Sequence, residues 1–116
     1  MMENRKLQTL LVPLDGTVTS EAGLRWAAVA AYRSGCTLRL ITVVQDAGDN
    51  GRAERYLRQK VASLRSEAVK AQAEVILGDP TESILRESHD ADLTILTSGT
   101  TRWFASEVLD GVLKSM

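Results

Sequence analysis

Apolar and polar positions follow two different rhythms along this chain. Four short apolar runs are typical of strands that are buried on both faces of a parallel sheet. Between these runs and after the last one, apolar residues recur every three or four positions, as on the buried side of a helix. The predicted strands cover residues 7–14, 38–44, 73–77 and 93–97. The pattern therefore predicts four strands that alternate with four helices.

Two of the predicted helices have clear end signals. Ala22, Trp26 and Val29 recur at helical spacing, and we expect Trp26 to be a packing residue. Gly35 ends this first helix, because glycine readily adopts the left-handed conformation that follows a last helical turn. The third helix begins after Asp79, which caps it and is followed by a proline at the first helical position.

The other two helices are predicted from periodicity. A polar loop over residues 46–51 is the candidate mobile segment. A long amphipathic helix follows over residues 52–71, with Leu57 and Leu64 on its apolar stripe. From residue 104 onward, apolar pairs recur every four residues, and this tail is predicted to form the last helix.

Length and element order together define the fold class. Residues 1–116 suffice for one domain with a single sheet and are too few for two cores. The alternation favours an α/β fold, a doubly wound parallel sheet with right-handed crossovers and helices on both faces. The single cysteine, Cys36, excludes an internal disulfide and is predicted to lie in the core.

Charge and targeting signals limit the expected partners. The net charge of -1 gives no reason to expect nucleic acid or an anionic membrane as a partner. The basic residues between 52 and 65 are predicted to form a solvated helix face. No signal peptide and no apolar run near the ~20 residues that span a bilayer are visible. We therefore expect a cytoplasmic protein.

Sequence signatures of enzymes are missing. There is no Gly-x-x-x-x-Gly-Lys phosphate loop and no Gly-x-Ser-x-Gly elbow. The only histidine, His89, is expected at a helix end. Asp90 and Asp92 precede the fourth strand, at the sheet edge opposite the ligand side. We predict no catalytic residues and no metal site.

The most informative polar group follows the first strand. The sequence Val-Pro-Leu-Asp-Gly-Thr at residues 12–17 places a carboxylate and a hydroxyl at a strand's carboxyl end, where open α/β sheets bind ligands. Taken with residues 77–82 and 91–96, in this order and spacing, the chain resembles the universal stress protein family over nearly its whole length. The resemblance implies a Rossmann-like sheet of strand order 3-2-1-4 and a role in stress response.

The resemblance also implies a nucleotide site, with ATP as the possible cofactor. The residue matching Asp15 bonds the ribose in ATP-binding members, and those matching Pro13 and Val43 frame the adenine. Asp15 equally fits a second role, as a turn residue that caps the following segment and needs no ligand. Gly99 is the one glycine found in the expected phosphate loop.

The phosphate half of this site departs from the family pattern of three glycines followed by Ser or Thr. Arg102 stands where the second glycine is expected. In one alignment the third position falls on residues 106–107, and Glu107 would bring a negative charge near the phosphates. In the other it falls on Gly111, but a valine follows it. Either alignment predicts weakened or lost ATP binding.

Two classes of function follow. One is a non-catalytic regulatory module that acts through dimerisation or partner binding, and the altered phosphate loop favours it. The alternative is an adenine-nucleotide-binding module, whose partner contacts depend on ATP, with at most slow hydrolysis. The family's fifth strand has no counterpart before Met116, which leaves residues 93–97 as an edge strand. We expect a second copy or another partner to cover this edge.

Overall fold

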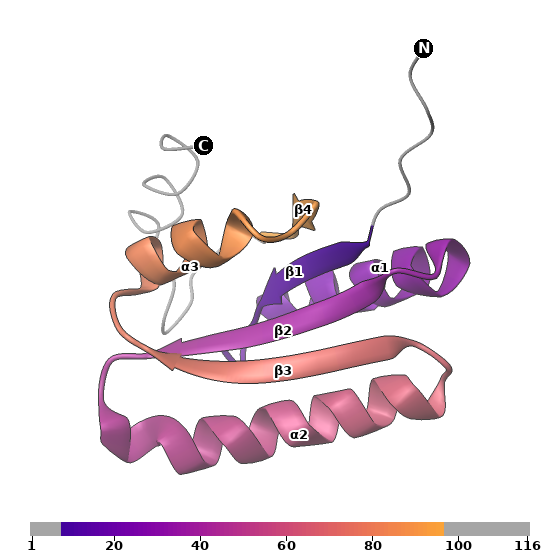
Figure 1. Ribbon diagram of the computed structural model, residues 1–116. Helices are drawn as coiled ribbons and strands as arrows, with labels where there is room; N and C mark the ends of the chain where they lie inside the picture. The colour runs from indigo at the N-terminus through magenta and orange to yellow at the C-terminus, as the bar shows by residue number, and fades with distance from the viewer. Residues whose placement is uncertain (1–7, 97–116) are drawn as a thin grey trace.

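The computed structural model describes residues 8–96, within which four parallel strands form one sheet (Figure 1). The strands are β1 (Thr9–Pro13), β2 (Thr37–Val44), β3 (Lys70–Leu77) and β4 (Leu93–Thr94). Their order across the sheet is β3-β2-β1-β4, which confirms the predicted topology. The chain adds β2 and β3 on one side of β1 and then crosses back to add β4 on the other side. The order of strands across the sheet therefore reverses at β1.

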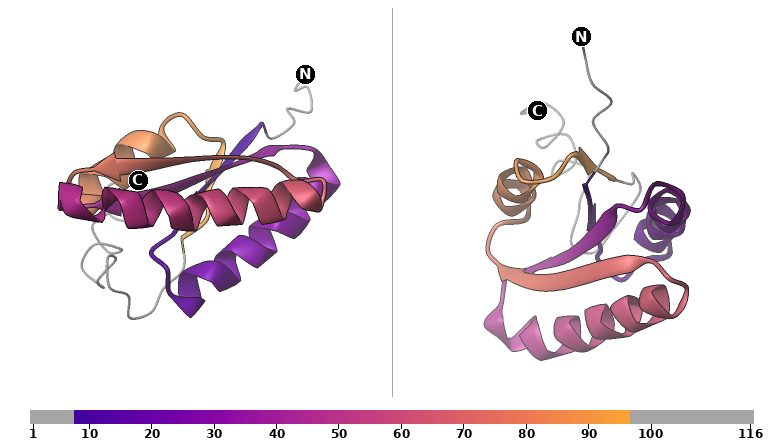
Figure 2. Two further views of the ribbon diagram at one scale, coloured as in Figure 1. Left: turned by 90° about the horizontal axis from the view of Figure 1, so that it is seen from below. Right: turned by 45° about the vertical axis from the view of Figure 1, so that its right-hand side comes forward.

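The helices cover both faces of the sheet. They are α1 (Val18–Ser34), α2 (Asn50–Ser66), α3 (Pro80–Ser88) and the short 3-10 helix η1 (Ala47–Asp49). α1 and α2 lie on one face and α3 on the other, as the right-hand view of Figure 2 shows. This follows from right-handed crossovers, since the connection from β3 back to β4 runs in the opposite direction to the first two.

The hydrophobic core consists of two layers, separated by the sheet. The layer under α1 and α2 is the larger and includes Leu10, Val12, Leu38, Leu40, Leu24 and Leu57. The layer under α3 includes Leu11, Ile41, Val43, Ile76 and Ile84. Alternate residues of β1 and β2 enter opposite layers, because successive side chains of a strand point to opposite faces. Cys36 is buried in the larger layer, as predicted.

The end of α2 and the loop before it differ from the prediction. α2 ends at Ser66 and not at residue 71, and β3 already begins at Lys70. Ala68 has φ 66° and reverses the chain, which pairs Lys70 with Thr37 of β2. The segment predicted as a polar loop contains η1 and the first two residues of α2, with Asp46 accepting a hydrogen bond from the Gly48 N–H at 2.9 Å.

The orientation of α1 also differs. Trp26 and Val29 are 60% and 55% exposed, so the prediction that Trp26 packs in the protein is wrong. The face toward the sheet carries Leu24, which enters the core, and Gly23 and Ala27, whose small size lets the helix approach the strands. Because α1 is apolar on two faces, helical spacing alone did not identify the buried one.

The last described elements are short. His89 follows α3 and is exposed, as expected for a helix-end residue. β4 is shorter than predicted, although the Ile95 N–H still donates to the Leu11 carbonyl at 2.9 Å. Gly99, the alternative phosphate-loop alignments and the predicted last helix lie outside the described residues. Within residues 8–96 no helix is long and apolar enough to cross a membrane.

Candidate functional site

Asp15 lies at the carboxyl end of β1, where the sheet order reverses. The Leu14 N–H donates to the Ile41 carbonyl at 2.8 Å, so the chain stays bound to β2 up to the residue before Asp15. Gly16 then turns the chain with φ +84°, a conformation that favours glycine. Asp15 is 2% exposed, although it is an ionisable residue at the carboxyl-terminal edge of the sheet.

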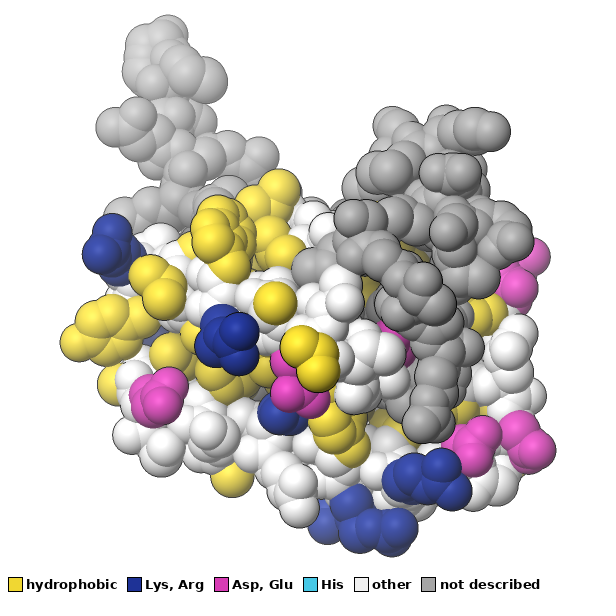
Figure 3. Space-filling model, turned by 180° about the vertical axis from the view of Figure 1, so that it is seen from behind, with side chains coloured by type: hydrophobic (Ala, Val, Ile, Leu, Met, Phe, Trp, Pro, Cys, Tyr) yellow, Lys and Arg dark blue, Asp and Glu magenta, His cyan; other side chains and the backbone are white. Residues whose placement is uncertain are grey.

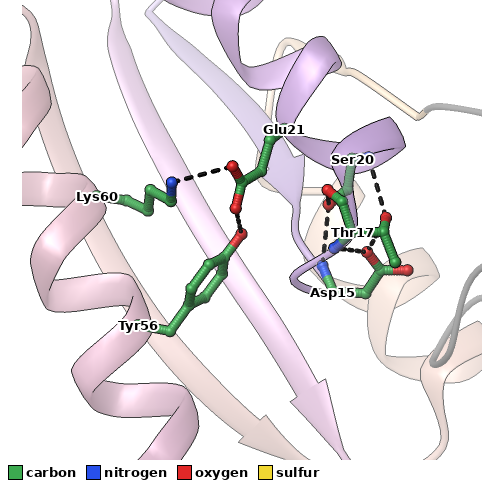
Figure 4. Close-up of polar contacts among 6 residues, drawn as sticks. All are labelled: Asp15, Thr17, Ser20, Glu21, Tyr56 and Lys60. Atoms are coloured by element: carbon green, nitrogen blue, oxygen red, sulfur yellow. Dashed lines mark hydrogen bonds and ion pairs between the residues drawn. The ribbon is translucent and has the colours of Figure 1, made fainter.

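One carboxylate oxygen of Asp15 organises the turn into α1. Oδ1 accepts hydrogen bonds from the Thr17 N–H at 3.0 Å and from the Thr17 hydroxyl at 2.6 Å. Thr17 Oγ1 in turn accepts from the Ser20 N–H at 3.2 Å and caps the helix (Figure 4). These contacts give Asp15 the structural role of a turn residue, and they occupy only half of its carboxylate.

The second oxygen of Asp15 is buried and has no hydrogen-bond partner among residues 8–96. An unpartnered buried acceptor costs about 1–3 kcal/mol and is uncommon in folded proteins. A donor supplied from outside, such as a hydroxyl group, would satisfy this oxygen. The turn therefore holds the carboxylate by one oxygen and leaves the other without a partner among the described residues.

Of the other residues predicted for this site, two lie at the same end of the sheet as Asp15 and one is not described. Pro13 is buried two residues before Asp15 and pairs with Ile41. Val43 lies two residues after Ile41 on β2 and is buried in the layer under α3. The structure thus places Pro13, Asp15 and Val43 at the same end of two neighbouring strands. Gly99 lies outside the described residues.

Sequence analysis missed Thr42. Its hydroxyl donates to the Leu14 carbonyl at 3.0 Å, and the residue is fully buried. The bond holds the carboxyl ends of β1 and β2 together directly beside Asp15. The available signal was a hydroxyl residue inside an apolar strand, since a buried hydroxyl requires a partner.

A second polar group links the first turn of α1 to α2. The Tyr56 hydroxyl donates to Glu21 Oε2 at 2.7 Å, and Lys60 Nζ lies 3.1 Å from Oε1 (Figure 4). Burial and the bond to Glu21 raise the pKa of Tyr56 above its ordinary value, so the hydroxyl stays a donor. Burial opposes ionisation of Glu21, but the contacts with Tyr56 and Lys60 outweigh it and lower the pKa of Glu21.

Among the described residues, no group of His, Cys, Asp and Glu has a metal-binding arrangement. Asp92 accepts hydrogen bonds from the backbone of residues 8 and 9, at the edge away from Asp15.

The fold and the site together define a Rossmann-like α/β protein with a polar group at the point where the strand order reverses. The family model described as "Universal stress protein family" matches residues 6–115. The chain belongs to the universal stress protein family.

Solved structures share this fold at low sequence identity. A universal stress family protein from Burkholderia pseudomallei is 19% identical, with TM-score 0.79, over 97% of this chain and 92% of that one. UspA from Lactobacillus plantarum is 20% identical, with TM-score 0.77, over 96% and 93%. The Archaeoglobus fulgidus protein in complex with dAMP is 19% identical, with TM-score 0.71, over 95% and 92%. No curated protein gives a significant sequence match.

Proposed function

We propose that this protein is a non-catalytic regulatory module that binds the adenosine part of a nucleotide at Asp15, with weakened binding of the phosphates. The observation that carries the proposal is the buried Oδ2 of Asp15, which has no hydrogen-bond partner in the described part of the chain. A ribose hydroxyl would donate to this oxygen without disturbing the two bonds that Oδ1 makes to Thr17. The nucleotide would act as a bound signal that stabilises one state of the module.

The adenine would be framed by Pro13 and Val43. Both residues lie at the carboxyl ends of adjacent strands, at the edge where sheets of this type bind ligands. The solved relative that holds dAMP supports an adenine nucleotide as the ligand class. The hydroxyl of Thr17, which donates to Asp15, also caps α1, so we assign it a structural role and propose no reaction.

Weak phosphate binding is argued from the sequence. Gly99 is the only glycine of the expected loop, and Arg102 replaces the second one. Glycines allow the backbone N–H groups to approach a phosphate closely, and a larger residue interferes with that approach. In the alignment that keeps the predicted last helix intact, Glu107 would add a negative charge beside the phosphates.

Thermal and chemical unfolding with adenosine, AMP and ATP tests the proposal. A ligand at ~100 times its Kd stabilises the native state by about 2.7 kcal/mol. We expect AMP and ATP to give similar stabilisation. Asp15→Asn should abolish it, because Asn keeps an acceptor for Thr17 but turns an amide donor toward the ribose.

Asp79→Asn is the matched control for this variant. Asp79 also follows a strand and caps a helix, accepting from the Glu82 N–H at 2.9 Å, but its carboxylate is exposed. The control should retain the nucleotide effect. Much stronger stabilisation by ATP than by AMP would contradict weakened phosphate binding. No stabilisation by any of the three ligands would contradict the nucleotide site and leave a pure interaction module.

We further propose that a second copy of the chain covers the β4 edge. Within residues 8–96, β4 pairs only with β1, and its outer side has no strand beside it. Leu93 is 43% exposed on this strand. An open edge presents unpaired backbone groups that associate readily with another chain.

A further inference from the structure

The outward face of α1 is apolar over the length of the helix. Val18 is 85% exposed, Trp26 60% and Tyr32 65%. Ala22 and Val29 are exposed between them, so the five side chains form one stripe at helical spacing, here called the α1 stripe. Four of the six large hydrophobic residues exposed in the described part of the chain belong to it. Figure 3 looks onto this face.

Basic side chains are frequent on both α1 and α2. The helices α1 and α2 together carry seven Lys and Arg residues but only two Glu residues. Six of these residues are exposed arginines that make no ion pair with a described residue: Arg25, Arg33, Arg52, Arg55, Arg58 and Arg65. In contrast, residues 79–92 carry five acidic residues and one arginine. The charge is therefore unevenly distributed, because basic residues exceed acidic ones on α1 and α2 and acidic residues exceed basic ones in residues 79–92.

We propose that the α1–α2 face binds the surface of anionic lipid bilayers, without crossing them. A helix face with exposed Trp and Tyr, aliphatic residues and arginines matches the interface between lipid headgroups and acyl chains. The α1 stripe would enter this interface, and arginines of α1 and α2 would contact the lipid phosphates. This inference is independent of the nucleotide proposal.

Two other anionic partners fit this face less well. A nucleic acid backbone would use the arginines, but it would leave the four large apolar side chains of the stripe without a role. An acidic peptide would have to lie in the furrow between α1 and α2. That furrow is lined by Glu21 and Glu67 as well as by Arg25 and Lys60, so its charge does not select an acidic ligand.

Vesicle co-sedimentation of the full chain tests the proposal. We expect binding to phosphatidylcholine vesicles that contain about one third phosphatidylglycerol, and little binding to pure phosphatidylcholine. Binding should fall as NaCl rises from roughly 50 to 500 mM, because the arginine–phosphate attraction is screened. In a Trp103→Phe background, the emission of Trp26 should move to shorter wavelength on the vesicles.

Paired variants locate the surface. Val29→Glu and Leu77→Glu each place a charge on an aliphatic residue of equal exposure, 55% and 56%. Val29→Glu should weaken binding at least tenfold, whereas Leu77→Glu should change it less than twofold. Arg55→Gln should weaken binding about fivefold. Arg86→Gln on α3 is its control and should have no effect.

Several results would overturn the proposal. These are no binding to either vesicle, equal effects of Val29→Glu and Leu77→Glu, and an unchanged Trp26 spectrum on bound vesicles. Displacement of the protein from vesicles by a 30-nucleotide duplex, with Val29→Glu leaving duplex binding intact, would assign the basic face to nucleic acid instead. A circular dichroism spectrum of each variant confirms that it is folded.

Discussion

At the residue scale, the turn after β1 combines a glycine of positive φ with a carboxylate that bonds the turn through one oxygen only. Gly16 adopts φ +84°, and the only other described glycine with positive φ is Gly35, at the end of α1. A Cβ added at either position would meet no atom within 4 Å. Any cost of alanine there is therefore conformational, which makes the two glycines a matched pair.

We expect Gly16→Ala and Gly35→Ala each to lower the free energy of unfolding by about 1–2 kcal/mol, because an L-residue is strained in the left-handed region. Urea denaturation measures this. Only Gly16→Ala should also reduce the stabilisation by adenosine, since only Gly16 positions Asp15. Equal loss of the adenosine effect in both variants would contradict a ligand at the β1 turn.

Sequence reasoning at this scale succeeded where a residue type is unusual for its place. Asp15 and Gly16 interrupt an apolar run, so they were identified as a strand end with chemistry. Thr42 was missed, because a threonine inside a strand is ordinary and only its bond to the Leu14 carbonyl gives it significance. That bond joins residues 28 positions apart, which no local pattern reveals.

At the element scale, Glu21 connects α1 to α2. It accepts from the Tyr56 hydroxyl and pairs with Lys60, both of which lie on α2. The two helices otherwise meet mainly through the core layer beneath them. Because these contacts lower the pKa of Glu21, they stabilise the folded protein only while the carboxylate is ionised.

We expect Glu21→Gln to be less stable than the wild type at pH 7. The stabilisation is present above the unfolded-state pKa, near 4.5, and is lost as pH falls through the lower pKa of the folded state. The difference in unfolding free energy should therefore vanish in acid. Glu54→Gln, at an exposed position of α2 that makes no ion pair with a described residue, is the control. A Glu21→Gln deficit that persists below pH 3 would mean that packing, not charge, causes it.

The ends of elements were predicted well where a side chain marks them and poorly where packing decides. Asp79 and Gly35 were identified correctly as a helix start and a helix stop. The end of α2 was placed five residues too late, since nothing in its apolar spacing breaks at Ser66. The chain leaves the helix there because Lys70 must pair with Thr37 of β2.

At the scale of the whole molecule, the sheet has two different edges within residues 8–96. β3 is eight residues long and pairs with β2 along its whole length, whereas β4 is two residues long. The proposed second copy at β4 would extend the sheet on its shorter side. It would leave the α1–α2 face free, because those helices lie over the sheet and not at that edge (Figure 2).

Sedimentation velocity over a wide concentration range tests this edge contact. We expect a dimer in the wild type, and a shift toward monomer in Leu93→Lys, because a lysine on an edge strand opposes pairing. Leu77→Lys, at a similarly exposed residue of β3, should remain dimeric. A wild type that stays monomeric at the highest concentration would contradict the edge proposal and leave the lipid proposal untouched.

The sequence by itself determined the order of strands and helices, the class of fold and the location of Asp15. Those features depend on local periodicity and on residue types that mark strand and helix ends. Only the tertiary structure decided which face of α1 is buried, that one oxygen of Asp15 lacks a partner among the described residues, and that α1 and α2 lie on the opposite side of the sheet from α3. These depend on which distant segments pack together, since burial and charge distribution arise from long-range contacts rather than from neighbours in the chain.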